Sequence, residues 1–416
     1  MKYDLTVIGG GFSGVAAAVS AARAGLKVLL IEKSGSLGGA MSNCLVYPFM
    51  RFWTTNPENN ERIDLSKGIF TEMREKHELL NPGATSFLFN PEYFRMVLDN
   101  LCNDAGVDVL FHAVMYDVAK EGRTINSINV IAGSEKICIK SDFFIDATGD
   151  GNLFYMAGCD FTSGREKDGL CQPMTICFRM SGVDIELFKK DIDNLQKLYS
   201  EHRQQGKIKN PREDLLYFFG IGDGIVHFNT TRIVKLNPTD PFDVSKAEMK
   251  GREQITETVN FLKENSDAFK NAALSSIAAD IGIRESRKLK GEHILTEKEL
   301  KDCVDFEDSI ALGNYDIDIH NPEGSGTSHY FFKDGEYYKI PYRSLLPKEF
   351  DNLLVAGRCI STTHEAQASI RIMPICACLG EAAGVAVAVA KQTGTNTHTV
   401  DVDIIREKLR LSGAAV

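Results

Sequence analysis

Near its start the chain reads Leu5-Thr6-Val7-Ile8-Gly9-Gly10-Gly11-Phe12-Ser13-Gly14, an apolar strand followed directly by a glycine-rich turn. Gly9 suits a tight turn, Gly11 lets a pyrophosphate approach the backbone, and Gly14 lets the next helix pack closely on the strand. The sequence predicts that helix over 13–24 and a second strand over 27–31, and Glu32 follows where a ribose would be bound. Together these features predict a βαβ dinucleotide-binding unit with an anion at the helix N-terminus.

Composition and net charge limit the class of protein. The chain has 416 residues, 43% of them hydrophobic, which is enough for one large or two medium domains. Its formal net charge of -10 argues against nucleic acid or an anionic membrane as the main partner. The first strand begins almost at once, without the pattern of a signal peptide, so we expect a cytoplasmic protein.

Neither a membrane span nor an iron–sulfur or zinc site is predicted. The longest apolar run, near 382–390, is shorter than the ~20 residues that cross a bilayer, so we expect a buried helix over 374–391. Ten cysteines are scattered without a Cys-x-x-Cys pair, which predicts reduced structural thiols.

Shifts in composition divide the chain into three regions. Residues 1–165 hold the βαβ start and several strand-like runs, whereas 166–340 is more polar, with a strand-like piece at 175–180 and a charged helical tract at 245–270. Residues 341–416 return to apolar sequence. We therefore predict an α/β protein: a Rossmann-like core with a parallel sheet, formed by the first and third regions, and an inserted cap domain with a mixed or antiparallel β-sheet and helices. The active site is expected where cap and core meet.

Further motifs resemble the FAD-dependent oxidoreductases of the glutathione-reductase-like superfamily over nearly the whole chain. They are the N-terminal glycines with Glu32, Leu37-Gly38-Gly39, Asp146-Ala147-Thr148-Gly149-Asp150-Gly151 and the segment 352–384. Four more are similar to a bacterial subgroup whose substrates are mostly unassigned: Gly282-Ile283-Arg284-Glu285-Ser286-Arg287, Asp316-Ile317-Asp318-Ile319-His320, Ile340-Pro341-Tyr342-Arg343-Ser344-Leu345 and Ala356-Gly357-Arg358-Cys359-Ile360-Ser361.

The resemblance implies FAD as the cofactor and a set of residues that bind it. In the superfamily the glycine after the C-terminal apolar strand and the next helix touch the flavin, where a helix N-terminus would stabilise negative charge on the reduced ring. Arg358 departs from the pattern, because many relatives carry an Asp there. The implied FAD-binding residues are Gly9, Gly11, Gly14, Glu32, Lys33, Gly38, Gly39, Thr148, Gly149, Asp150, Gly357, Arg358, Met373 and Cys376.

The chain lacks the residues for two kinds of chemistry, dithiol exchange and nicotinamide binding, that occur in related proteins. Met41 and Val46 occupy the positions of the redox-active cysteine pair in the disulfide reductases, and Cys44 has no partner at the required spacing. The glycines at 220–224 precede a strand-like run instead of a helix, so we interpret them as a hairpin turn, not a nicotinamide-binding unit. Electrons are therefore expected to pass directly between substrate and flavin, with another acceptor or oxygen closing the cycle.

Candidate catalytic residues are fewer. His364 is the first choice for a base, because it lies in the loop between the flavin-contacting strand and the last core helix. Arg371 precedes that helix, and it, Arg284 or Arg343 could hold a carboxylate or hydroxyls, or simply tie cap to core. His320 shares one strand face with two aspartates at 316 and 318; this face enters the cleft or is solvated, and a metal site there is a weaker idea. No metal is predicted.

The sequence thus predicts an FAD-dependent oxidoreductase that moves a hydride between flavin and a small organic substrate, with a sugar or a hydroxy acid suggested by analogy. Two alternatives remain open. One is a tRNA-modifying flavoprotein, which should show a basic face. The other is an electron-transfer subunit related to heterodisulfide reductases, which would need cysteine runs for iron–sulfur clusters. The electron acceptor and the oligomeric state are not fixed by the sequence.

Overall fold

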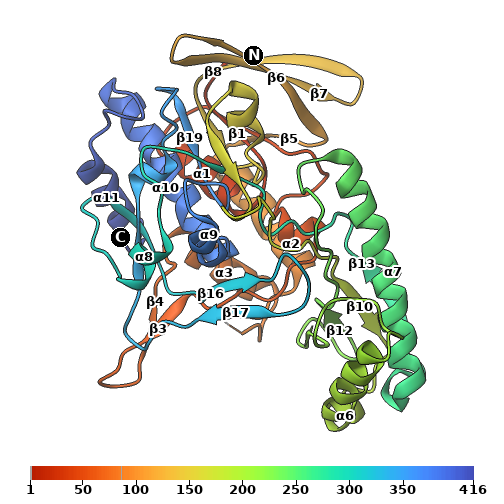
Figure 1. Ribbon diagram of the computed structural model, residues 1–416. Helices are drawn as coiled ribbons and strands as arrows, with labels where there is room; N and C mark the ends of the chain where they lie inside the picture. The colour runs from red at the N-terminus through yellow and green to blue at the C-terminus, as the bar shows by residue number, and fades with distance from the viewer. Residues whose placement is uncertain (1, 86) are drawn as a thin grey trace.

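A computed structural model describes residues 2–85 and 87–416 as an α/β molecule built on a central seven-stranded sheet (Figure 1). The strand order is β5-β2-β1-β8-β7-β6, with β19 also paired to β8. β1, β2, β5, β19 and the second half of β8 are parallel, whereas β6 and β7 are antiparallel. The seven strands are β1 (Lys2–Ile8), β2 (Val28–Ile31), β5 (Asp108–Leu110), β6 (Ala113–Glu121), β7 (Thr124–Ala132), β8 (Glu135–Asp146) and β19 (Leu353–Val355).

Two helices cover one face of this sheet in direct backbone contact. α1 (Phe12–Arg23) follows the glycine turn, and α10 (Met373–Thr393) packs along it. A Cβ at Gly380 would lie 2.0 Å from the carbonyl oxygen of Ser13, and one at Gly384 2.3 Å from that of Ala17. These glycines therefore allow the two backbones to touch.

α10 is long and apolar enough to cross a bilayer, yet most of it is buried inside the protein, as predicted for a core helix. The predicted α/β class with a Rossmann-like parallel sheet is confirmed. The cytoplasmic location stays a prediction.

Shorter elements surround this core. Four two-stranded ribbons lie at its margins: β3–β4 (Trp53–Thr55, Arg62–Asp64), β9–β14 (Phe161–Ser163, Arg287–Leu289), β15–β18 (Ser309–Gly313, Tyr338–Pro341) and β16–β17 (Ile317–His320, Thr327–Tyr330). The remaining helices of this part are α2 (Ala40–Asn43), α3 (Ile69–Leu80), α4 (Pro91–Ala105), α5 (Asn152–Ala157), α8 (Glu297–Lys301), α9 (His364–Ile370) and α11 (Val402–Leu411).

A second, smaller part has its own sheet and its own hydrophobic core. Its four strands are antiparallel, in the order β11-β12-β10-β13, and two long helices pack beside them (Figure 1, lower right). The elements are β10 (Phe178–Ser181), α6 (Ile185–Gln204), β11 (Tyr217–Phe218), β12 (Val226–Phe228), α7 (Pro241–Asn265) and β13 (Ala273–Ile277). The predicted cap with an antiparallel sheet and helices is therefore present, and the glycines at 220–224 join β11 to β12 as a hairpin.

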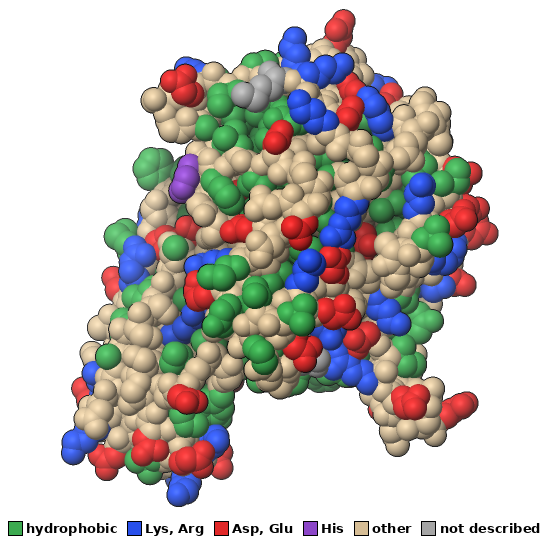
Figure 2. Space-filling view, turned by 180° about the vertical axis from the view of Figure 1, so that it is seen from behind, with side chains coloured by type: hydrophobic (Ala, Val, Ile, Leu, Met, Phe, Trp, Pro, Cys, Tyr) green, Lys and Arg blue, Asp and Glu red, His purple; other side chains and the backbone are tan. Residues whose placement is uncertain are grey.

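The second hydrophobic core is formed by a shorter stretch of sequence than the predicted cap segment 166–340. Apart from Leu45, its buried members lie between Met174 and Ile281, and the buried apolar residues from Leu289 to Ile340 pack into the first core. Seen from behind, the molecule is hollowed at its lower edge, between the α6–α7 part and the β3–β4 ribbon (Figure 2). Acidic and basic side chains are interspersed on this face. The domain boundaries remain a prediction.

Candidate active site

A cavity of about 610 Å³ lies between the two parts and takes side chains from both. One end is formed by backbone turns of the core; we call it the cofactor end. It contains Gly11, Phe12, Ser13, Gly38, Ala147, Gly149, Gly357, Arg358, Met373 and Cys376. The other is rich in charged and polar side chains; we call it the polar end. It contains Arg212, Glu213, Asp214, Asn229, Arg284, Tyr315, Asp318, His320, Thr327, His329 and Arg371.

Two helix N-termini meet at the cofactor end. The N-cap of α1 is Gly11 and that of α10 is Ile372, and neither residue has a polar side chain that could cap the helix. The first N–H groups of both helices and their dipoles are thus available to an anion or a polar ligand. Ser13 Oγ, also at this end, is buried without a hydrogen-bond partner among the described residues.

Glycines bring the surrounding turns close together. Gly38 (φ 105°) and Gly39 (φ 54°) adopt conformations that other residues rarely take, and a Cβ at Gly39 would lie 3.0 Å from Gly11 Cα. The two remaining fingerprint glycines are not among the residues that line the cavity. A Cβ at Gly9 would lie 2.4 Å from the Ala147 oxygen, and one at Gly14 1.7 Å from the Gly9 oxygen. Gly9 and Gly14 therefore serve the turn and the helix packing.

The acidic residue of the fingerprint is buried at the end of β2. Glu32 accepts hydrogen bonds from the backbone N–H groups of Gly10 (2.7 Å) and Ser34 (2.8 Å). These bonds hold the carboxylate beside the glycine turn, where a ribose is predicted. Lys33, by contrast, is exposed and lies 3.5 Å from Asp280, outside the cavity lining.

The turn after β8 supports Arg358. The Arg358 guanidinium donates to Asp150 Oδ1, which also accepts from Ser286 Oγ at 2.7 Å. It lies so close to Gly149 that a Cβ there would be 2.2 Å from Arg358 Nη1. Thr148 bonds to the carboxylate of Asp146 and so fixes the turn. The arginine that departs from the superfamily pattern is thus paired with a neighbouring aspartate.

At the polar end, three donors converge on one carboxylate oxygen. Asp318 Oδ2 accepts from Tyr315 Oη (3.0 Å) and Arg371 Nη2 (3.1 Å) and lies 3.3 Å from His320 Nε2. Burial alone would raise the pKa of Asp318, but the His320 hydrogen bond and the Arg371 charge hold it below its ordinary value. Asp318 Oδ1 is buried without a hydrogen-bond partner in the described part of the chain.

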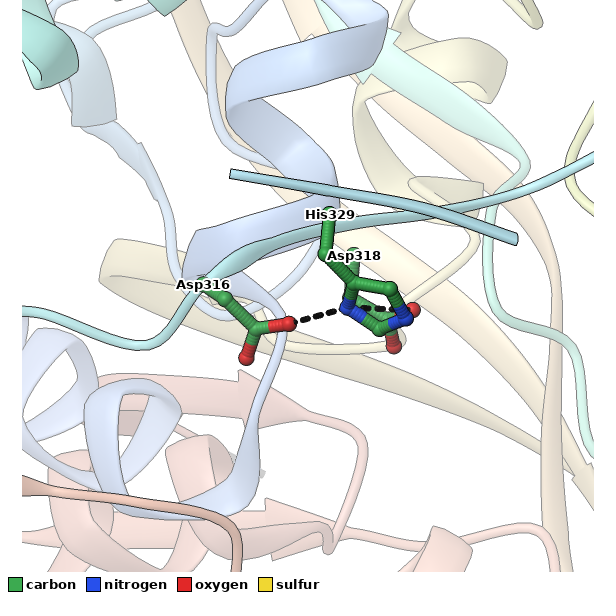
Figure 3. A group of neighbouring side chains, drawn as sticks. All are labelled: Asp316, Asp318 and His329. Carbon is green, nitrogen blue, oxygen red and sulfur yellow. Dashed lines mark hydrogen bonds and ion pairs between the residues drawn. The ribbon is translucent and has the colours of Figure 1, made fainter. Parts of the chain in front are cut away.

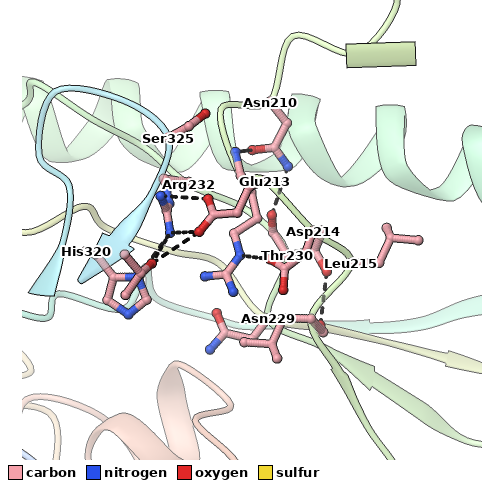
Figure 4. Close-up of polar contacts among 12 residues, drawn as sticks. Asn210, Glu213, Asp214, Leu215, Asn229, Thr230, Arg232, His320 and Ser325 are labelled. Atoms are coloured by element: carbon pink, nitrogen blue, oxygen red, sulfur yellow. Dashed lines mark hydrogen bonds and ion pairs between the residues drawn. The ribbon is translucent and has the colours of Figure 1, made fainter. Parts of the chain in front are cut away.

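His320 is held neutral in one tautomer. Arg232 Nη2 donates to His320 Nδ1 at 3.1 Å, so the ring proton is on Nε2 and faces Asp318. Burial and the charge of Arg284 lower the pKa of His320 to about 3. Arg232 also pairs with Glu213 at 2.9 Å, and Figure 4 shows it between Glu213 and His320.

A match over almost the whole chain shows the family to which it belongs. A family model described as FAD dependent oxidoreductase matches residues 4–409. The chain belongs to this family. It is an enzyme, and FAD is its cofactor.

Individual relatives are more distant. The chain is 26% identical over 195 residues to digeranylgeranylglycerophospholipid reductase 1 of Methanococcoides burtonii, a match that covers 44% of this chain and 46% of the relative. It is 52% identical over 42 residues to the mitochondrial dihydrolipoyl dehydrogenase of Schizosaccharomyces pombe, which covers 10% of this chain and 8% of that one. The chain thus matches less than half the length of these curated relatives.

Among solved structures, a geranylgeranyl bacteriochlorophyll reductase-like protein of Thermoplasma acidophilum has a TM-score of 0.46 and 13% identity. The match covers 99% of this chain and 83% of that one. The narrower assignment of this FAD oxidoreductase to the glutathione-reductase-like superfamily stays a prediction.

The residues at the cofactor end fit FAD. Two helix N-termini without side-chain caps, an unpartnered Ser13 hydroxyl and glycine turns that leave no room for a Cβ suit a pyrophosphate and a flavin edge. Among the predicted FAD-binding residues, those that line the cavity are Gly11, Gly38, Gly149, Gly357, Arg358, Met373 and Cys376.

The predicted catalytic residues of this FAD oxidoreductase are only partly brought together. Arg371 and His320 line the cavity, but His364 is not among its lining residues. His364 is buried, and its Nδ1 lies 2.7 Å from Glu285, which also pairs with Lys288. Burial alone would raise the pKa of Glu285, but the His364 hydrogen bond and the Lys288 charge lower it.

Seven of the polar-end residues are not among the predicted site residues: Arg212, Glu213, Asp214, Asn229, Tyr315, Thr327 and His329. Arg212, Glu213 and Asp214 form a charged triplet that is typical of a surface loop, so nothing local marks it as part of a site. Tyr315 directly precedes the motif that begins at Asp316, and that position was its single available signal.

Two other groups near the cavity have simpler roles. Asp316 pairs with His329 Nδ1 at 2.5 Å, and the His329 ring lies beside Asp318 (Figure 3). Ligand atoms of these three residues lie within 4.8 Å of one another, but we interpret the group as an ion pair and assign it no metal. Burial and Asp280 raise the pKa of the Cys44 thiol to about 12, which leaves it protonated.

Proposed function

We propose that this enzyme transfers a hydride between FAD and a small organic substrate bound at the polar end of the cavity. The observation that carries the proposal is that one cavity joins both helix N-termini of the cofactor end to the side chains around Asp318. A substrate at the polar end would therefore adjoin the site of the cofactor, as direct hydride transfer requires.

The side chains of the polar end orient the substrate. FAD, when bound, supplies the hydride acceptor or donor. Asp318 is held ionised, and its Oδ1, which lies 3.9 Å from His329 Nδ1 and has no hydrogen-bond partner in the described residues, accepts a hydrogen bond from a substrate O–H or N–H. Arg371 lies between this carboxylate and the start of α10, so it fixes the substrate relative to the cofactor end. His320 keeps Asp318 in place through its Nε2 proton.

In this proposal His364 acts indirectly and does not touch the substrate. Its partner Glu285 accepts from the backbone N–H of Gln172 at 3.0 Å, and the Gln172 amide oxygen accepts from the backbone N–H of His320 at 3.4 Å. We therefore assign His364 a positioning role through this chain of hydrogen bonds instead of the role of base.

The charged wall of the polar end favours a polar substrate, so a sugar or a hydroxy acid remains our proposal for its class. A purely hydrocarbon substrate would leave Asp318 Oδ1 without a hydrogen bond. The tRNA-modifying and electron-transfer alternatives have less support, because acidic and basic side chains are interspersed in Figure 2 and the group of potential metal ligands found in the described chain contains no cysteine.

The test is spectroscopic. The purified enzyme should show a flavin absorption band, and one class among sugars, hydroxy acids and nicotinamide donors should bleach it without oxygen. Asp318→Asn should retain the band but lose the bleaching. A colourless protein that takes up no FAD, or a band that no member of the panel bleaches, would contradict the proposal.

A further inference from the structure

Charge at the polar end is unevenly balanced. Four arginines surround it, and three of them have a carboxylate partner: Arg212 with Asp214 (2.6 Å), Arg232 with Glu213 (2.9 Å) and Arg371 with Asp318 (3.1 Å). The fourth, Arg284, has no acidic side chain within ion-pair distance anywhere in residues 2–85 and 87–416. Its Nη1 donates to the backbone oxygen of Pro173 at 2.8 Å.

Backbone hydrogen bonds hold Arg284 in this position. Its backbone oxygen accepts from Gln367 Nε2 of α9 at 2.8 Å, and Gly282, two residues earlier, pairs with Thr175 within the smaller part. Arg284 lines the cavity and is half-buried, so its remaining N–H groups are accessible from within. Burial and the charges of Arg371 and Arg212 lower the pKa of Arg284 to about 9, although the charge of Asp318 acts in the opposite direction.

An unpaired cation is costly in a partly desolvated cavity, and an anion that enters removes that cost. The planar guanidinium matches a carboxylate, which it can bind through two parallel N–H···O bonds. A doubly charged phosphate shares this chemistry but exceeds the single unpaired charge and meets three neighbouring carboxylates. The balance therefore favours a singly charged group.

We propose that Arg284 is the anchor for the carboxylate of a small organic acid, the substrate class of this enzyme. The inference rests on the proposed function and decides between its two substrate classes in favour of the acid. The bound acid would have its hydroxyl near Asp318 Oδ1 and its reacting carbon toward Gly357 and Met373, which line the same cavity.

Matched pairs of probes test the anchor directly. Calorimetry on the FAD-loaded enzyme, at constant ionic strength, would compare gluconate with glucose and lactate with lactamide, and inorganic phosphate alone. We expect at least one carboxylate to bind at least about tenfold more tightly than its neutral partner and than phosphate. Tighter binding of phosphate, or no preference for either carboxylate, would overturn the proposal.

Variants separate the anchor from general charge effects. Arg284→Gln should weaken carboxylate binding by about ten- to a hundredfold, and Arg284→Lys should restore part of it, because a lysine keeps the charge but loses the planar fork. Arg343→Gln is the matched control, since Arg343 pairs with Asp308 outside the cavity lining and half of its side chain is exposed. Equal losses in Arg284→Gln and Arg343→Gln would overturn the assignment.

The bound flavin shows whether a variant is still folded. Each variant should keep the visible spectrum and FAD stoichiometry of the wild type, and an Arg284→Gln protein that loses FAD would show that Arg284 supports the fold and would overturn the anchor. If neutral sugars alone bleach the flavin, the inference fails and the proposed function stands. If carboxylates bind but nothing bleaches the flavin, the proposed function fails while the anion site remains.

Discussion

The two ends of the cavity are built from different materials. The cofactor end consists mainly of main-chain groups: two helix N-termini and glycine turns so close that added Cβ atoms would collide. The polar end consists of side chains from both parts: two ion pairs lie in the smaller part, the Arg371–Asp318 pair lies in the larger one, and the Arg232–His320 hydrogen bond joins them. The first is therefore sensitive to shape and the second to charge, so substitutions at the two ends should fail in different ways.

The largest effect is expected for Gly14→Ala. A Cβ at Gly14 would lie 1.7 Å from the Gly9 oxygen, so α1 must move away from β1 and from the cofactor end. We expect a loss of about 3 kcal/mol in the free energy of unfolding and a sharp fall in bound FAD. Chemical denaturation and flavin absorbance measure both. Gly25→Ala is the control: nothing lies within 4 Å of its Cβ, so its positive φ should cost only about 1 kcal/mol. Equal effects would show that the clash does not matter.

A charge change at the other end should spare the flavin. Asp318→Asn removes the charge on which Tyr315, His320 and Arg371 converge, so turnover should fall about a hundredfold or more while FAD content stays constant. Steady-state kinetics and flavin quantification give the two numbers. Asp308→Asn, which removes the partner of Arg343 outside the cavity lining, should leave turnover unchanged. Loss of FAD in Asp318→Asn would contradict the separation of the two ends.

A third prediction concerns how stability depends on pH through a buried residue of α10, the helix that supports the cofactor end. Glu381 of α10 is buried, and burial raises its pKa from 4.5 to about 7, although the Ile69 N–H and the Ser412 hydroxyl bind it. Because the folded state disfavours the charged form, the contribution of Glu381 to stability is fully present below pH 4.5 and is lost as the pH rises through 7. The shift corresponds to about 3 kcal/mol. Glu381→Gln should lack this dependence in denaturation curves from pH 4 to 8. A pH profile identical to that of the wild type would refute the assignment.

The smallest effect distinguishes two roles for His364. If His364 only positions Glu285 and Gln172, His364→Ala should lower kcat only about three- to tenfold. The pH profile of kcat and the FAD content should stay unchanged. His364→Gln, which can still donate to Glu285, should recover part of the rate. A loss of two or more orders of magnitude, with the basic limb of the pH profile removed, would restore it as the base.

The same contrast explains what the sequence could predict. Glycine spacing reports backbone geometry, so the βαβ unit, the buried α10 and the residues of the cofactor end follow from local pattern. Side-chain partners do not, because Arg212, Arg284 and Arg371 meet only after the chain has folded across both parts. The proximity of His364 to Gly357 in sequence predicts it as the base, whereas its partner Glu285 is 79 residues away.

The pairing of β8 also has a consequence for biosynthesis. One edge of β8 at residues 144–146 stays open until Leu353–Val355 leaves the ribosome, and α1 lacks its neighbour until α10 has been made. The nucleotide cradle is therefore completed only after β19 and α10 have been made, long after its glycine fingerprint. Nascent chains therefore carry an exposed strand edge and an uncovered apolar helix while the residues between β8 and α10 are made, and such surfaces favour aggregation.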